Sequence, residues 1–142
     1  MTIVVDASVA LKWLLPEPDS GTAERVMSAK GLLIAPTLLV AETCNAVWKR
    51  LRRREITTEH TDLVVAQLPQ ILDRLVADTL LAPAALRIAR EIDHPVYDCF
   101  YLALAERENA PLVTADRRLV ERVSGTPWAG RVVALDAWSA TG

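Results

Sequence analysis

The amino-acid sequence predicts an α/β domain with a central parallel sheet of four to five strands, flanked by helices. Short apolar runs rich in β-branched residues alternate with longer stretches of helical periodicity, which is the pattern of strands joined by crossover helices. The runs are apolar on both faces, as is typical of strands that helices cover on both sides. Because 142 residues is close to the common size of one domain, we expect a single domain over residues 1–142.

Short apolar runs mark the predicted strands. Each is rich in aliphatic or β-branched residues and is separated from the next by helix-forming sequence. The predicted strands cover residues 2–5, 32–35, 111–114 and 131–135. Connections of this length favour parallel strands with right-handed crossovers.

The segments between these runs are predicted helices, with ends marked by capping residues, proline or glycine. In chain order the predicted helices cover residues 7–15, 20–30, 37–54, 56–77, 80–92, 95–108 and 117–123. Gly31 follows the second helix as a C-cap would, and Thr37 is the expected N-cap of the third. Pro69 interrupts or ends the fourth helix, and Pro95 opens the sixth. The sixth contains a continuous apolar block, residues 99–105, so we expect it at the centre of the domain.

The third predicted helix changes character along its length. Its aliphatic stripe at helical spacing is Val40, Cys44, Val47 and Leu51. Between residues 38 and 48 only Glu42, Thr43 and Asn45 are polar, so we expect the first three turns to be buried nearly all round. Glu42 is then a partly buried carboxylate with Asn45 on its face. The far end, residues 49–54, is strongly basic and is expected to be a solvated helix end, with RNA contact as the alternative.

Composition and charge narrow the class of protein. A net charge of −2 excludes a generally basic nucleic-acid binder, although a local basic patch could still bind RNA. The start of the chain lacks the basic region of a signal peptide, and the longest mostly apolar run, residues 32–41, is too short to span a membrane. Cys44 and Cys99 lie far apart without metal-ligand spacing. We therefore expect a cytoplasmic protein with reduced thiols and no membrane association.

Acidic residues occupy four related places in the predicted topology. Asp6 follows the first strand and Asp116 follows the strand over residues 111–114. Glu42 and Asp98 lie in the early turns of helices that are expected to begin at the same edge of the sheet. In open parallel sheets the ligand crevice lies at the carboxyl ends of the strands. The topology therefore predicts four carboxylates at one rim.

Such a cluster is electrostatically costly without a partner. Two carboxylates about 5 Å apart repel by roughly 3 kcal/mol at an effective dielectric constant of about 20. The total stability of a folded domain is only about 10 kcal/mol. Either protons or a divalent cation must offset the repulsion. Oxygen ligands favour Mg²⁺ or Mn²⁺, which support phosphodiester hydrolysis. Ser8 and Thr114 are expected to orient a carboxylate or a metal-bound water.

Four sequence motifs are spread over nearly the whole chain: VVDASV at 4–9, AETCNAVW at 41–48, YDCFYLALAERENAPLVTAD at 97–116 and RVVAL at 131–135. Together, and in family order, they resemble a PIN domain, specifically the VapC toxins of bacterial and archaeal toxin–antitoxin pairs. The resemblance implies a Mg²⁺- or Mn²⁺-dependent endoribonuclease that is restrained by a cognate VapB-like antitoxin and forms a homodimer. Asp6, Glu42, Asp98 and Asp116 match the acidic quartet of the family. Thr114 and Asn45 match its supporting polar positions.

Other functions remain open at this stage. A receiver domain would need a lysine after a late strand, and the only lysines are Lys12, Lys30 and Lys49. A non-catalytic PIN-like binding module that retains the acidic pocket is the principal alternative. Taken singly, the aspartates could also be helix caps or complement a helix dipole.

Several other residues can be interpreted as either structural or functional. Arg117 and Arg118 adjoin Asp116 and could contact substrate phosphate, or could simply form an ion pair there. His60 and His94 lack any triad or metal spacing, so we expect structural roles for both. The tryptophans are expected to be core or interface anchors rather than platforms for bases; they are Trp13, Trp48, Trp128 and Trp138.

Overall fold

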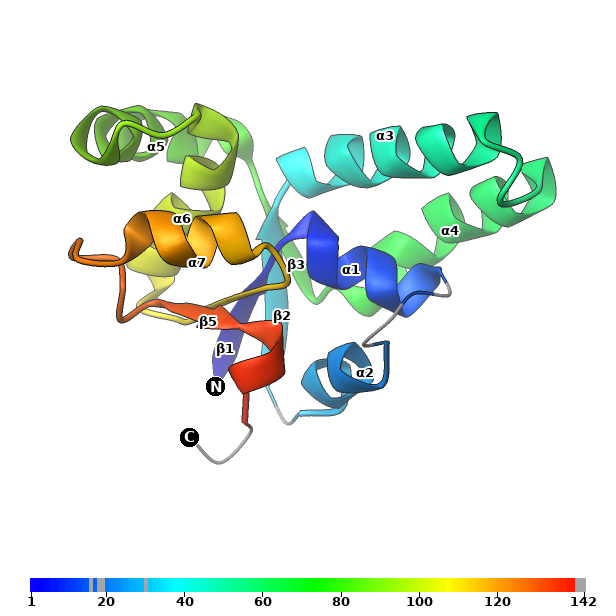
Figure 1. Ribbon diagram of the computed structural model, residues 1–142, viewed down its shortest axis with the longest axis horizontal. Coiled ribbons are helices and arrows are strands. Elements are labelled where there is room, and N and C mark those ends of the chain that lie inside the picture. Colours follow the sequence, from blue (N-terminus) through cyan, green and yellow to red (C-terminus); the bar gives the residue numbers. More distant parts are fainter. Residues whose placement is uncertain (16, 18–19, 30, 140–142) are drawn as a thin grey trace.

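The computed structural model describes residues 1–15, 17, 20–29 and 31–139, and these form a parallel sheet of five strands in the order β3-β2-β1-β4-β5 (Figure 1). The strands are β1 Thr2–Val5, β2 Leu32–Pro36, β3 Arg74–Val76, β4 Leu112–Thr114 and β5 Val132–Ala134. The central strand, β1, pairs with β2 on one side and β4 on the other. The predicted α/β class with a parallel sheet is confirmed.

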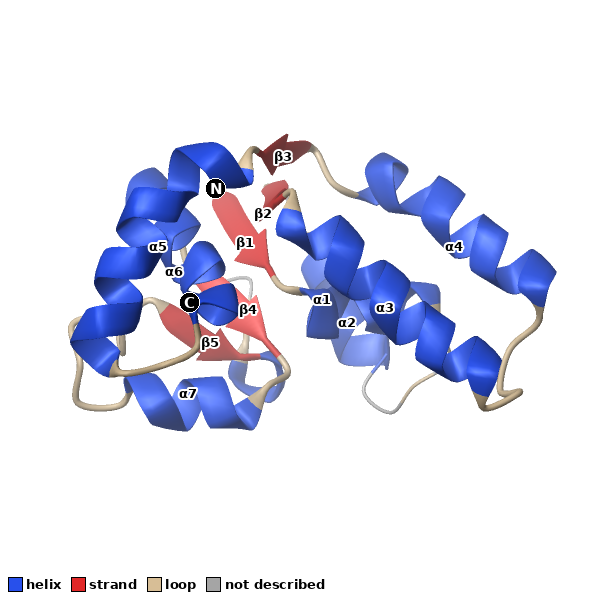
Figure 2. Ribbon diagram, turned by 90° about the horizontal axis from the view of Figure 1, so that it is seen from above, coloured by secondary structure: helices blue, strands red, loops and turns tan. Residues whose placement is uncertain are grey.

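Helices lie on both sides of this sheet, with α1 to α4 on one side and α5 and α6 on the other (Figure 2). They are α1 Ala7–Leu14, α2 Ser20–Ser28, α3 Leu38–Arg52, α4 Thr58–Ile71, α5 Asp78–Ile92, α6 Val96–Glu108 and α7 Arg117–Val123, followed by a 3₁₀ turn at Leu135–Ala137. No helix among the described residues has the length and apolar character needed to cross a bilayer. Lys30, the end predicted for the second helix, lies outside the described residues.

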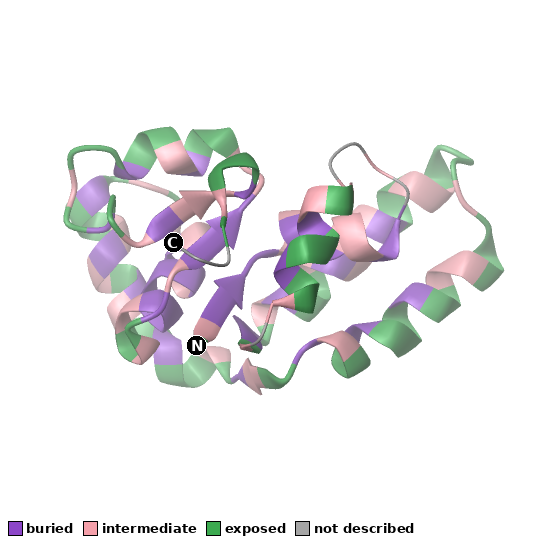
Figure 3. Ribbon diagram, turned by 90° about the horizontal axis from the view of Figure 1, so that it is seen from below, coloured by how far each residue is buried: buried purple, intermediate pink, exposed green. Residues whose placement is uncertain are grey.

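The core surrounds β1 and α6. Ile3, Val4 and Val5 are fully buried, and α6 packs against β1, β2 and β4. Within the apolar block 99–105 every residue is buried except Phe100, which is partly buried. Figure 3 shows the buried positions concentrated in the strands and in the helix faces that meet them. The central place predicted for this helix is therefore confirmed, and packing on the sheet holds α6 in position.

The helix predicted over residues 56–77 ends near Pro69, as one of the two predicted outcomes had it, and the prediction of helix beyond that point is wrong. Helix α4 ends at Ile71, and Arg74–Val76 forms the edge strand β3 beside β2. Asp73 joins the two strands, since its side chain accepts a hydrogen bond from Leu33 N at 2.7 Å and its own N–H donates to Leu33 O at 2.8 Å. A strand this short is stabilised by its pairing with β2 rather than by its own sequence.

Helix α3 is less buried than expected. Its inward face is Leu39, Thr43 and Val47, whereas Val40 is exposed and Trp48 is 51% exposed. The helix extends with α4 beyond the sheet, as both ribbon views show, so its later turns have no sheet to cover (Figures 1 and 2). The expectation of three turns buried nearly all round is therefore wrong.

The start of α3 is capped by another helix. Thr37 makes no side-chain cap to α3, contrary to expectation. Instead Leu38 N donates to Asp78 Oδ1 at 3.0 Å, while Asp78 N donates to Thr37 Oγ1 at 3.1 Å. The first turns of α3 and α5 thus cap each other, which fixes the position of α3 near the sheet.

Gly31 serves strand pairing rather than helix capping. Helix α2 ends at Ser28, and a Cβ at Gly31 would lie 2.7 Å from the carbonyl oxygen of Met1. The adjacent Leu32 N donates to that same oxygen at 2.8 Å. The absence of a side chain therefore allows β1 and β2 to approach at their first residues.

Candidate active site

Asp6 lies at the carboxyl end of the central strand and is 6% exposed. Its Oδ1 accepts a hydrogen bond from Ser8 Oγ at 2.5 Å and one from Val9 N at 3.3 Å, so Asp6 also caps α1. Its Oδ2 accepts a hydrogen bond from Thr114 Oγ1. Burial raises the pKa of Asp6 from 3.8 to about 6 although these bonds lower it, and the charge of Asp98 raises it further.

Glu42 lies in the second turn of α3, half-buried beneath the hydroxyl of Tyr101. Tyr101 OH donates to Glu42 Oε1 at 2.5 Å. Burial raises the pKa of Glu42, the Tyr101 hydrogen bond lowers it, and the charges of Asp98 and Asp78 raise it. Burial, followed by the charge of Glu42, also raises the pKa of Tyr101, so this phenol remains a hydrogen-bond donor. Tyr101 was not predicted as a site residue, although it lies one turn after Asp98.

Asp98 lies in the first turn of α6 with its side chain 30% exposed. His94 Nε2 is 2.7 Å from Asp98 Oδ2. His94 was expected to have a structural role, and its contact with Asp98 was not predicted. The available signal was their closeness in sequence, since His94 lies just before α6 and Asp98 lies in its first turn. Because Asp98 raises the pKa of both Asp6 and Glu42, these three acids share one electrostatic environment.

Asp116 joins this group through Thr114. Its Oδ1 accepts from Arg118 N at 2.9 Å, so Asp116 is the N-cap of α7. Its own N–H donates to Thr114 Oγ1 at 3.0 Å, and that hydroxyl in turn donates to Asp6. Ser8 Oγ accepts from the N–H of residue 115 at 3.0 Å. Ser8 and Thr114 therefore link the carboxyl ends of β1 and β4.

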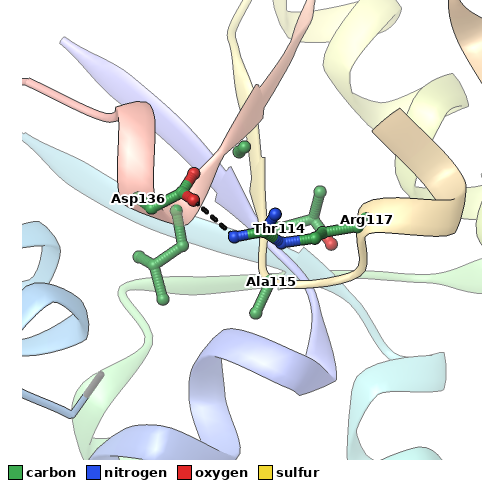
Figure 4. Close-up of a pocket in the computed structure, with 6 residues that line it drawn as sticks. Thr114, Ala115, Arg117 and Asp136 are labelled. Carbon is green, nitrogen blue, oxygen red and sulfur yellow. Dashed lines mark hydrogen bonds and ion pairs between the residues drawn. The ribbon is translucent and has the colours of Figure 1, made fainter. Parts of the chain in front are cut away.

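The remaining predicted residues surround this group without contacting the acids through their side chains. Asn45 is exposed on α3, one turn after Glu42. Arg117 Nη2 is 2.9 Å from Asp136 Oδ2, and both border a small hollow beside Thr114 (Figure 4). The side chain of Arg118 is exposed, and only its backbone N–H reaches Asp116. Arg117 is thus paired with Asp136 rather than with Asp116.

Comparison with known proteins identifies the family. The family model described as the PIN domain matches residues 3–125. The chain belongs to the PIN domain family. It is 32% identical over 126 residues to ribonuclease VapC3 of Pyrobaculum aerophilum, covering 86% of this chain and 95% of that protein.

Solved structures share the PIN fold. The crystal structure of PAE2754 from Pyrobaculum aerophilum has a TM-score of 0.68 and 23% identity, covering 96% of this chain and 85% of that one. The structure of VapBC2 from Rickettsia felis, bound to a DNA fragment from its promoter, contains a chain with a TM-score of 0.64 and 15% identity. That match covers 98% of this chain and all of the other.

The donor set of this PIN domain fits a hard divalent cation. Asp6, Glu42 and Asp98 supply only oxygen, and the pKa of Asp6 and that of Glu42 are raised, so added positive charge would stabilise their ionised forms. Among the described residues, no three His, Cys, Asp or Glu side chains lie close enough together to hold a metal ion. The acids therefore lie near one another on different helices and strands, without forming a closed coordination site for a metal ion.

Proposed function

We propose that this PIN domain is a metal-dependent endoribonuclease and the toxin of a type II toxin–antitoxin pair. The observation that carries the proposal is the buried Asp6 at the end of the central strand, within the electrostatic influence of Asp98. The 32% identity to a protein named ribonuclease VapC3, over 95% of its length, supports hydrolysis of RNA. A buried carboxylate whose pKa stays raised despite three hydrogen bonds is costly to the fold, so a chemical role accounts for it better than a structural one.

Asp6, Glu42, Asp98 and Asp116 would hold Mg²⁺ or Mn²⁺. When bound, such an ion supplies a nucleophilic hydroxide from water and stabilises the leaving oxygen of a phosphodiester. We expect the four carboxylates to differ in mobility, because Asp6 is buried whereas the side chain of Asp98 is 30% exposed.

The neighbours of the acids position them. Ser8 and Thr114 donate to both oxygens of Asp6, which fixes the plane of the carboxylate. Tyr101 orients Glu42 and His94 orients Asp98, each through one hydrogen bond. Supporting groups of this kind hold ligands in a productive geometry. Asn45 is proposed as a further supporting polar residue, and Arg117 and Arg118 are proposed to contact the substrate around this group.

The proposed partners are RNA, a VapB-like antitoxin and a second copy of the chain. Support for the antitoxin comes from the likeness in fold to a chain of the VapBC2 complex and from the name VapC of the curated relative. Co-expression with a VapB-like antitoxin, followed by purification and light scattering, tests both protein partners. A toxin that stays monomeric and passes through an antitoxin column would contradict both assignments.

The test of the catalytic proposal is cleavage of total RNA by purified protein with Mg²⁺, with Mn²⁺ and with EDTA. We expect cleavage with either ion, none with EDTA, and a loss of at least about 100-fold in Asp98→Asn, because losing a ligand should cost more than the about 10- to 100-fold typical of losing a group that supports one. Asp62→Asn, which changes an exposed acid on α4, is the matched control and should cleave like wild type. Cleavage that persists in EDTA would contradict the metal requirement. RNA binding without cleavage under all conditions would favour the non-catalytic binding module.

A further inference from the structure

Helix α3 connects the acidic group to a basic surface. Lys49 follows Glu42 by seven residues, and Arg53, the C-cap of the helix, follows it by eleven, so each of the two projects within about 20° of Glu42 around the helix. The rise of the helix places Lys49 about 10 Å and Arg53 about 16 Å beyond Glu42. A ligand that leaves the acids along this face of α3 therefore meets these two cations in turn.

An aromatic side chain lies beside this path, about a third of a turn around the helix from Glu42. Trp48 is 51% exposed, and the guanidinium of Arg52 lies 5.5 Å from the centroid of its ring. Trp48, Lys49, Arg52 and Arg53, here called the α3 basic surface, line a hollow on the protein surface. The indole therefore contributes little to the hydrophobic core, although tryptophan is usually highly buried.

Within the part of the chain that the structure describes, the cations of this surface have no acidic partners. Among the described residues no carboxylate forms an ion pair with Lys49, Arg52 or Arg53, whereas the neighbouring Arg50 pairs with Glu17 and with Glu55. Because the whole chain has a net charge of −2, this positive charge is a local feature rather than part of a basic protein. A polyanion is the ligand class that it would attract.

We propose that the α3 basic surface binds single-stranded RNA on one side of the scissile bond. This inference rests on the proposed function and adds a binding site outside the acidic group. An exposed indole with an adjacent arginine provides a stacking platform for a base, and Lys49 and Arg53 provide contacts to phosphates. The distance of about 10 to 16 Å from Glu42 corresponds to about three to five nucleotides of a stacked strand, at about 3.4 Å each.

The test measures binding separately from cleavage. Fluorescence anisotropy of a labelled single-stranded oligoribonucleotide is recorded in EDTA, in the Asp98→Asn background, over a range of salt concentrations. Trp48→Ala is expected to weaken binding about tenfold, since one stacked base is lost. The double variant Lys49→Ala/Arg53→Ala is expected to lower the slope of log K against log salt by about 1.4, or about 0.7 for each phosphate contact.

The matched control is Arg90→Ala/Arg107→Ala, which removes two exposed arginines from α5 and α6. It should leave both the affinity and the salt slope unchanged. Circular dichroism and thermal unfolding verify that each variant is folded. Unchanged affinity and slope in the α3 variants would overturn the proposal, and so would an equal loss in the control.

Three further outcomes distinguish the RNA-binding proposal from an interface between copies and from the catalytic proposal. If light scattering shows that Trp48→Ala changes the oligomeric state while RNA affinity is unchanged, the surface is an interface between copies and the RNA proposal fails. If the α3 variants lose affinity as expected but wild type cleaves no RNA with any ion, the catalytic proposal fails and the binding surface stands. Wild type that binds no RNA in the anisotropy experiment overturns the binding surface.

Discussion

The two ends of helix α3 contrast in what surrounds them. Near the sheet, Glu42 is half-buried, receives a hydrogen bond from Tyr101 and experiences the charges of Asp98 and Asp78. Two turns later the helix has left the sheet, and Trp48 is exposed. Burial raises the pKa of the acid at one end, whereas the basic side chains at the other end remain in solvent. The same helix therefore holds one charged side chain, Glu42, where burial makes ionisation unfavourable, and basic side chains at its far end that stay hydrated.

The largest effect is expected in the buried half of this contrast, at Asp6. Its pKa is raised from 3.8 to about 6, so the folded state binds the proton more tightly than the unfolded state. The stabilisation that results is fully present below pH 3.8 and is lost as pH rises through about 6. The unfolding free energy of wild type minus that of Asp6→Asn should therefore fall by about 3 kcal/mol over this range. Urea unfolding in EDTA at a series of pH values measures the difference.

The same experiment contains its own controls. Asp62→Asn should follow wild type at every pH, because Asp62 is exposed. Mn²⁺ at neutral pH should raise the stability of wild type more than that of Asp6→Asn, since an ion binds the ionised carboxylate. A difference between wild type and Asp6→Asn that does not vary with pH would contradict the raised pKa.

The second effect concerns the hydrogen bond that holds Glu42. Tyr101→Phe removes the hydroxyl but keeps the ring, so the half-buried carboxylate loses its donor. We expect the unfolding free energy at pH 7 to fall by about 2 kcal/mol, the range for hydrogen bonds to charged groups. Chemical denaturation of the two proteins measures the change. Tyr97→Phe, an exposed hydroxyl in the same helix, is the control, and an equal loss there would show that the effect is not specific to Glu42.

A smaller effect is expected from His94, whose contact with Asp98 sequence reasoning missed. His94→Ala should weaken Mn²⁺ binding about tenfold, as is typical when a group that orients a metal ligand is removed. Isothermal titration with Mn²⁺ reports this without any cleavage assay. His60→Ala is the matched control, since the ring of His60 lies against the carbonyl of Leu14 at 3.4 Å. Equal Mn²⁺ affinity in His94→Ala and wild type would restore the structural interpretation of His94.

The smallest effect belongs to the exposed half of the contrast. Trp48→Ala should change the unfolding free energy by less than about 1 kcal/mol, because exposed substitutions and exposed cation–π contacts contribute little. Thermal unfolding measures the change. A loss comparable to that of Tyr101→Phe would mean that Trp48 is part of the core, and the contrast between the two ends of α3 would disappear.

The sequence predicts the place of a residue best where a single helix or strand determines it. Asp6 follows a strand and Asp98 begins a buried helix, so the parallel topology alone predicts that both lie at the same edge of the sheet, and the charge of Asp98 acts on Asp6. The sequence did not predict the features that depend on contacts between different helices and strands. The strand β3 depends on its pairing with β2, and the donation from Tyr101 to Glu42 joins α6 to α3. The exposure of Trp48 depends on how far α3 reaches beyond the sheet, which helical periodicity does not encode.

The hydrogen bond between Asp6 and Thr114 joins residues 108 positions apart, and it has a consequence for synthesis of the chain. Asp6, Glu42 and Asp98 all leave the ribosome before β4 does. Until β4 emerges, one edge of β1 is unpaired and Asp6 lacks one of its two hydroxyl donors. A polypeptide that is terminated before residue 112 therefore carries three of the four acids without the strand that completes their support. The nascent chain cannot assemble this group of carboxylates until the ribosome has passed residue 114.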